Sequence, residues 1–141
     1  EVNPNRRQRV GFRVPLVRTA MGRACIAAMQ GHERERLYSE LKEHYRKEWP
    51  QLRGELDDAV EQVDRRGFCI ASGTFLKTTN SVAVPFVHSD GRTLMAFNSQ
   101  GNASVQTRAA MERNGKLLLE LAVQVRQRLA TEPPTPSLGR R

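Results

Sequence analysis

The hydrophobic period of the sequence changes at Gly67, and this change limits the folds open to the chain. Before Gly67, apolar residues recur every three or four positions over residues 33–47 and 51–66, as they do in amphipathic helices. After it come three short apolar runs with the composition of strands, at residues 68–71, 81–87 and 93–98. The chain therefore has to combine helices with strands, in an α/β or α+β arrangement.

Capping residues predict two further helices. Thr19 can cap a helix of small residues over positions 20–29, and Ser104 can cap a closing helix over positions 104–130 with a weak point at Gly115. Periodicity predicts that the buried stripe of the closing helix consists of Leu117, Leu118, Leu121, Ala122, Val125 and Leu129.

Turn residues divide the region of the strands. Pro85 cannot donate a ladder hydrogen bond and so predicts a strand edge or a bulge, while residues 89–91 (Ser-Asp-Gly) predict a hairpin turn. Residues 72–80 form a polar loop that is too long for a tight turn. Because loops of this length near a core are often functional, the loop is a candidate site region.

The net charge of +8 first suggests a nucleic-acid binder, because phosphate neutralisation needs clustered cations. Residues 1–18 hold five arginines and one glutamate, and residues 131–141 hold two arginines and one glutamate. Five of the eight excess charges thus lie in the end segments, and the remainder alternates in sign as a solvated surface does. Aromatic residues are also scarce, at 6%, so we discount direct nucleic-acid binding by this segment.

The length of 141 residues allows one domain with one core. No stretch approaches the roughly 20 apolar residues of a membrane span and no signal segment opens the sequence, so we expect a cytoplasmic protein without a membrane contact. Cys25 and Cys69 form no CxxC pair, which predicts two buried thiols and no disulfide scaffold. The proline-rich residues 131–141 predict a disordered tail.

Motifs for catalysis and cofactors are missing. None of the three histidines, His32, His44 and His88, lies in a metal-binding pattern. The sequence also has no G-x-S-x-G elbow and no glycine-rich phosphate loop. We therefore predict no catalytic residue, no metal ligand and no cofactor.

Small and polar residues are instead placed where they can line a cavity. A helix that begins after Thr19 offers free amides suited to a carboxylate or another anion. The loop 72–80 and the strand residues Ser81 and Asn98 can add orienting polar groups. On residue types alone, a pocket and a purely structural role, with Thr19 only capping a helix and Asn98 only ending a strand, are equally good interpretations.

Residues 11–24 read Gly-Phe-Arg-Val-Pro-Leu-Val-Arg-Thr-Ala-Met-Gly-Arg-Ala, and residues 66–68 and 81–85 read Arg-Gly-Phe and Ser-Val-Ala-Val-Pro. In this order, followed by the strand at 91–98 and the long closing helix, the segments resemble the effector-binding domain of IclR-type transcriptional regulators. The first is similar to that family's G-x-x-x-P-x-x-x-T-A-x-G-[KR]-A segment. The resemblance covers residues 11–130.

The resemblance implies a GAF-like α/β domain, in which an antiparallel sheet is flanked by helices. Residues 1–130 are then one effector-binding domain with an incomplete N-terminal part. Such a domain binds a small organic acid and signals to a helix-turn-helix domain that the sequence does not contain, so DNA is contacted only through that other domain. The family also implies a homodimer or a homotetramer.

Carried over position by position, the family's effector contacts fall on seven residues, which are Ala20, Met21, Gly22, Ala71, Phe75, Ser81 and Asn98. Family members often have an acidic or polar residue at the position of Ala71 and acidic residues in the loop that follows. Their absence here predicts a less acidic pocket, suited to an aromatic or larger hydrophobic acid instead of a very small keto acid.

Two other classes of protein stay open. A small α/β enzyme that acts on an acidic substrate needs a titratable group in the pocket. The second class is a basic module that binds nucleic acid, and it predicts strong, salt-dependent binding by this segment alone.

Overall fold

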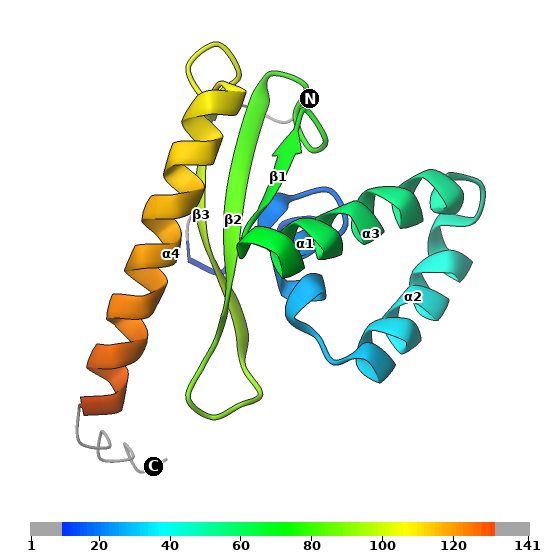
Figure 1. Ribbon diagram of the computed structural model, residues 1–141. Coiled ribbons are helices and arrows are strands. Elements are labelled where there is room, and N and C mark those ends of the chain that lie inside the picture. Colours follow the sequence, from blue (N-terminus) through cyan, green and yellow to red (C-terminus); the bar gives the residue numbers. More distant parts are fainter. Residues whose placement is uncertain (1–9, 132–141) are drawn as a thin grey trace.

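A three-stranded antiparallel sheet with helices on both faces forms the centre of the protein (Figure 1). The computed structural model describes residues 10–131 of the chain. Its elements are α1 (Ala20–Ala28), α2 (Gly31–Tyr45), the 3₁₀ helix η1 (Arg46–Glu48), α3 (Trp49–Arg66), β1 (Cys69–Ser72), β2 (Thr79–Val87), β3 (Leu94–Asn102) and α4 (Arg108–Thr131). The predicted fold class, an antiparallel sheet flanked by helices, is confirmed.

The strand order is β1-β2-β3, so β2 is central. Cys69 pairs with Ala83, and Ala83 pairs with Asn98 on the other side. Pro85 lies beyond the end of β1 and pairs only with Ala96 of β3. The prediction of an edge position at Pro85 is confirmed, because β2 has no neighbour on the β1 side there.

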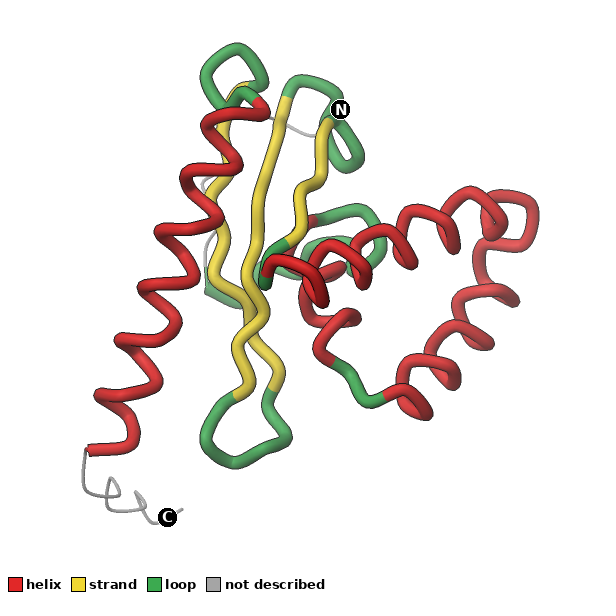
Figure 2. Tube along the Cα trace, viewed as in Figure 1, coloured by secondary structure: helices red, strands yellow, loops and turns green. Residues whose placement is uncertain are grey.

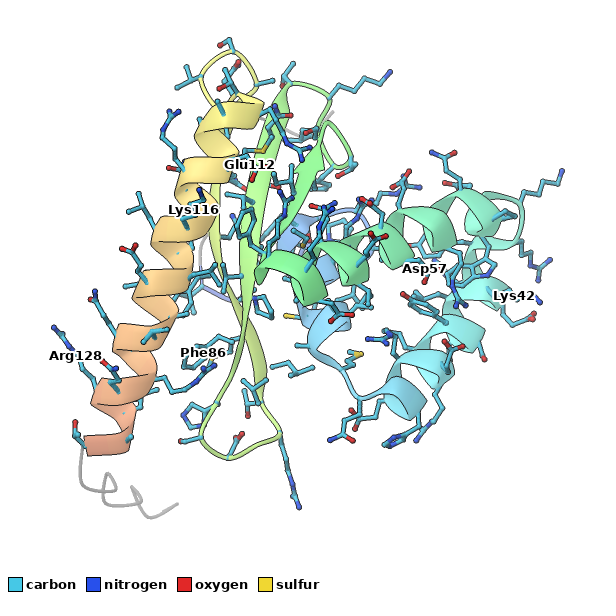
Figure 3. All side chains as sticks on the ribbon, viewed as in Figure 1. Lys42, Asp57, Phe86, Glu112, Lys116 and Arg128 are labelled. Atoms are coloured by element: carbon cyan, nitrogen blue, oxygen red, sulfur yellow. The ribbon has the colours of Figure 1, made fainter. Side chains whose placement is uncertain are left out.

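The two faces of β2 carry side chains of different size. Val82, Val84 and Phe86 face α4 and form a core with Phe68 of the α3–β1 link and Met111 of α4. Phe86 points from β2 toward α4 (Figure 3). Full burial of each such large side chain contributes about 1.5–3 kcal/mol, so this face holds α4 in place.

The opposite face of the sheet is covered by α1. Its cluster consists almost entirely of small side chains, which are Ala20, Ala24, Ala59, Cys69, Ala71 and Ala83. Because these residues project so little, α1 lies directly on the sheet. The longer helix α3 packs against α1, and α2 packs outside α3 (Figure 2).

Element ends differ from the predictions in several places. The third strand, predicted over residues 93–98, runs to Asn102 as β3, so Asn98 lies within the strand and does not end it. The closing helix begins at Arg108, since the Thr107 hydroxyl accepts a hydrogen bond from the Ala110 amide (3.2 Å), while the predicted cap, Ser104, bonds instead to the Asn102 side chain. The predicted loop 72–80 shortens to residues 73–78, because β1 and β2 each extend into it.

The predicted buried stripe of α4 is wrong at two positions. Leu117 and Leu121 are 60% and 41% exposed, and Leu119 packs on the core in their place. Helix α4 is rotated about its axis relative to the prediction, because Phe68 packs directly against the backbone of Gly115, which has no side chain.

The predicted buried thiols are confirmed for Cys69, whereas Cys25 is only half-buried. The predicted disordered tail lies outside the described residues, apart from Thr131.

Two helical glycines allow a matched test of this packing. A Cβ atom on Gly115 would lie 2.6 Å from the Phe68 ring, so Gly115→Ala is expected to lower the free energy of unfolding by about 1–3 kcal/mol. Gly54 of α3 is exposed with open space around it, so Gly54→Ala is expected to raise that free energy by about 0.5–1 kcal/mol. Urea unfolding measures both, and equal effects of the two substitutions contradict the interpretation.

Candidate functional site

A small cavity lies between the start of α1, the loop 73–78 and the face of the sheet that α1 covers. Its volume is about 20 Å³, enough for one water molecule. It is lined by Arg18, Thr19, Met21, Ala71, Thr74, Phe75, Leu76, Thr79, Ser81, Asn98 and Gln100.

The start of α1 is built by Thr19. The Thr19 hydroxyl accepts a hydrogen bond from the Gly22 amide (3.1 Å) and donates one to the Pro15 carbonyl (3.0 Å). Gly22 lies against the backbone of Leu16, where a Cβ atom would be 1.9 Å from the carbonyl oxygen. The segment before α1 therefore crosses tightly over the first turn of the helix, and Gly22 permits that crossing.

The buried guanidinium of Arg23 holds the same segment from the other side. Its Nε donates to the Val17 carbonyl (2.8 Å), and its Nη2 pairs with Glu55 of α3. Arg23 is only 5% exposed, so loss of Glu55 would leave a buried charge uncompensated. The cavity wall formed by residues 18–21 is thus fastened to α3.

The sheet supplies a row of residues that faces the cavity. Ala71, Ser81 and Gln100 lie in register across the three strands, and Asn98 lies two residues before Gln100 on β3. The Oδ1 atom of Asn98 is buried and has no hydrogen-bond partner among the described residues. Buried polar groups usually have a partner, so this acceptor is a candidate contact for a ligand.

A polar network on the other face of the sheet fixes the same end of β3. The buried side-chain amide of Gln106 donates to the Ser99 carbonyl and hydroxyl (3.2 and 3.1 Å), and its Oε1 atom accepts from the side chain of Asn114 of α4 (3.1 Å). The side chain of Asn80 donates to the backbone carbonyl of Gln106 (3.0 Å). The network ties β2, β3 and α4 together directly behind Asn98, and no sequence motif indicated it.

Five of the seven predicted site residues line the cavity, namely Met21, Ala71, Phe75, Ser81 and Asn98. The other two do not. Ala20 is packed into the cluster between α1 and the sheet, and Gly22 lies under Leu16. Arg18 and Gln100 also line the cavity and were not predicted as site residues, although Gln100 shares the face of Asn98 through the two-residue period of a strand.

Arg18 is the only ionisable residue among those that line the cavity, and its guanidinium pairs with Glu48. Burial raises the pKa of the nearby Cys69 thiol to about 12, so the thiol stays protonated, and its Sγ donates to the Ala20 carbonyl (3.6 Å).

Across residues 10–131, no group of three or more His, Cys, Asp or Glu side chains could hold a metal ion. In the same range, no helix is long and apolar enough to cross a membrane.

The family model of the C-terminal domain of the bacterial transcriptional regulator IclR matches residues 2–127. No curated protein sequence matches the chain. A solved structure of an IclR family transcriptional regulator from Brucella abortus is 30% identical with a TM-score of 0.80, and the match covers 92% of this chain and 48% of that one.

More distant structures show the same fold. The repressor BlcR from Agrobacterium tumefaciens is 17% identical with a TM-score of 0.70, over 89% of this chain and 52% of that one. An IclR homologue from Microbacterium hydrocarbonoxydans, solved in complex with 4-hydroxybenzoate, is 21% identical with a TM-score of 0.64, over 88% of this chain and 50% of that one. The chain spans about half the length of these proteins.

The cap at Thr19 can be tested without a ligand. Thr19→Val keeps the shape of the side chain but removes the acceptor for the Gly22 amide, so the free energy of unfolding is expected to fall by about 1 kcal/mol. Thr19→Ser keeps the hydroxyl and is the matched control. Equal values for the two variants in urea unfolding would show that the hydroxyl does not stabilise α1.

Proposed function

Because the chain belongs to the IclR family of bacterial transcriptional regulators, as a C-terminal domain of that family, we propose that it binds a small organic acid as an effector. The bound acid controls DNA binding by a separate helix-turn-helix domain of the same regulator. Residues 1–130 form the effector-binding domain in this proposal. The regulator acts in the cytoplasm, where bacterial DNA lies.

The observation that carries the proposal is the unpartnered Asn98 Oδ1 atom beside the start of α1. A ligand that donates a hydrogen bond to this atom removes the unfavourable burial of a lone acceptor. The first turn of α1 carries free amides and the positive end of the helix dipole, which favour a carboxylate. A ligand with a donor at one end and a carboxylate at the other fits both features.

The lining between these two ends favours an apolar ligand body. Met21, Ala71, Phe75 and Leu76 supply apolar surface, and no carboxylate lines the cavity within the described residues. Aromatic or larger hydrophobic acids therefore suit it better than a very small keto acid. The 4-hydroxybenzoate bound by the Microbacterium hydrocarbonoxydans protein is an acid of this kind.

Regulation follows from differential affinity. An effector that binds one arrangement of the subunits more tightly shifts the population toward it, whereas an effector with equal affinity for both arrangements shifts nothing. The arrangement concerned is that of a homodimer or a homotetramer. The DNA-binding domains then move with the subunits to which they are joined.

Binding is tested by calorimetry and thermal melting with benzoate and 4-hydroxybenzoate. We expect each acid to raise the melting temperature, because it binds the folded state only. Asn98→Leu, which is similar in size, is expected to weaken binding of 4-hydroxybenzoate by about tenfold, the equivalent of one lost hydrogen bond of about 1.4 kcal/mol.

The same substitution distinguishes a ligand contact from a structural role. Removal of an unpartnered buried acceptor leaves the stability of the free protein unchanged or higher. If Asn98→Leu instead lowers stability and leaves acid binding unchanged, Asn98 does not contact the ligand. If no acid raises the melting temperature, the proposed function fails.

The distribution of charge leads to a separate expectation for DNA. We expect the 141-residue chain to bind a labelled random duplex only weakly at 0.15 M salt, with a dissociation constant on the order of 10⁻⁴ M or higher, as in weak non-specific binding. Fluorescence anisotropy over a salt series measures this. Tight, steeply salt-dependent binding by the chain alone would support a nucleic-acid module instead.

A further inference from the structure

We propose that the loop of residues 73–78 is a lid over the cavity and that Phe75 on this lid sets the size of the ligand that enters. The part that concerns ligand size rests on the proposed function, whereas the part that concerns the lid rests on the structure alone. The lid is tied down by one side-chain hydrogen bond, from Thr74 to the segment before α1.

The volume of the cavity requires a movable wall. An apolar cavity of about 150 Å³ can hold benzene, and a single water molecule needs about 10–15 Å³. The cavity here measures about 20 Å³. An aromatic acid therefore cannot enter while all the walls keep their places.

Two of the three walls are fastened along their length. The first turn of α1 is capped by Thr19 and packed on the sheet through Ala20 and Ala24. The sheet wall is paired strand to strand and packed on both faces. Movement of either wall would break many contacts at once, which leaves the loop as the wall that can move.

The loop itself has few ties to the rest of the molecule. Thr74 Oγ1 donates to the Arg18 carbonyl at 2.7 Å, and both residues line the cavity. At the far end of the loop, the Ala103 amide donates to the Thr78 carbonyl at 2.8 Å. At the base of the loop, the Gly73 amide donates to the Thr79 carbonyl and the Thr79 amide donates to the Leu76 carbonyl. The loop therefore opens by breaking the Thr74 bond on the α1 side together with these two bonds at its base.

Phe75 is the bulkiest side chain on this lid, and it does not belong to the core. It is half-buried, lines the cavity and is a member of none of the three apolar clusters of the described residues. Its ring therefore forms part of the cavity wall and can move without disturbing the core. The apolar body of a ligand takes the space that the ring vacates, so the ring sets the size that is accepted.

The lid is tested first without any ligand. Hydrogen exchange at the Gly73 and Thr79 amides is measured in the wild type, in Thr74→Val and in Thr78→Val. Loss of the Thr74 bond is expected to speed exchange at both amides about fivefold, the equivalent of about 1 kcal/mol. Thr78 is exposed and its hydroxyl has no partner in the described structure, so Thr78→Val is the matched control and leaves exchange unchanged. Equal exchange in the two variants overturns the lid.

The size limit is tested by calorimetry with acetate, benzoate, 4-hydroxybenzoate and 2-naphthoate. Phe75→Ala is expected to tighten binding of 2-naphthoate about tenfold and to change that of acetate by less than about twofold, since only the larger acid needs the vacated space. Phe12→Ala is the control, because Phe12 is an exposed phenylalanine outside the cavity lining. Circular dichroism checks that each variant folds, and Phe75→Leu is expected to give intermediate values.

The two proposals fail in different ways. If acids bind but Phe75→Ala leaves their ranking by size unchanged, the role of Phe75 is overturned and the proposed function stands. If no acid binds the wild type or Phe75→Ala, the proposed function fails and the size limit falls with it. The exchange experiment decides the lid in either case.

Discussion

The close contact between α1 and the sheet is the constraint on which the site depends. Alanines from α1, α3 and all three strands, together with Cys69, form this contact, so the helix axis can approach the strands. Large residues stand on the opposite face of the same strand β2, where α4 packs. The difference in size between the faces brings the first turn of α1 over the polar end of β2 and β3. A cavity bounded by helix amides and strand side chains results from this packing.

Two ion pairs join the edge of the cavity to η1 and α3, and one hydrogen bond joins the loop 73–78 to the same edge. Arg18 pairs with Glu48, and Arg23 pairs with Glu55, so the residues before and within α1 are both fastened to the region of α3. The Thr74 hydroxyl bonds to the carbonyl of the same Arg18. A movement of the loop therefore acts first on the segment before α1, which the Arg18–Glu48 pair joins to η1. Of these pairs Arg23–Glu55 is the buried one, whereas Arg18–Glu48 is as exposed as the surface pair Arg53–Asp57 and contributes less, because exposed pairs are weak.

Part of the site could be predicted from the sequence. The cap at Thr19 follows from residue type, and so does the choice of the polar strand residues Ser81 and Asn98, while the similarity of residues 11–24 to a family segment directed attention to Met21. The same similarity assigned Ala20 and Gly22 to the site, but one is buried in the α1–sheet contact and the other under Leu16. Gln100 and the network of Gln106, Ser99 and Asn114 were not predicted. Their contacts join residues of separate elements, and no local pattern records which elements meet.

By itself the sequence determined the kind and order of the elements, because periodicity, caps and turn residues act over a few positions. It determined the change from helix to strand at Gly67, the special position of Pro85 in its strand and the scattered charge of the surface. Only the tertiary structure decided which side of α4 is buried, since the contact of Gly115 with Phe68 turns Leu117 outward. It also decided the size of the cavity and left the Asn98 Oδ1 atom without a hydrogen-bond partner within residues 10–131. These features arise from distances between elements far apart in the chain, which packing sets and local sequence does not.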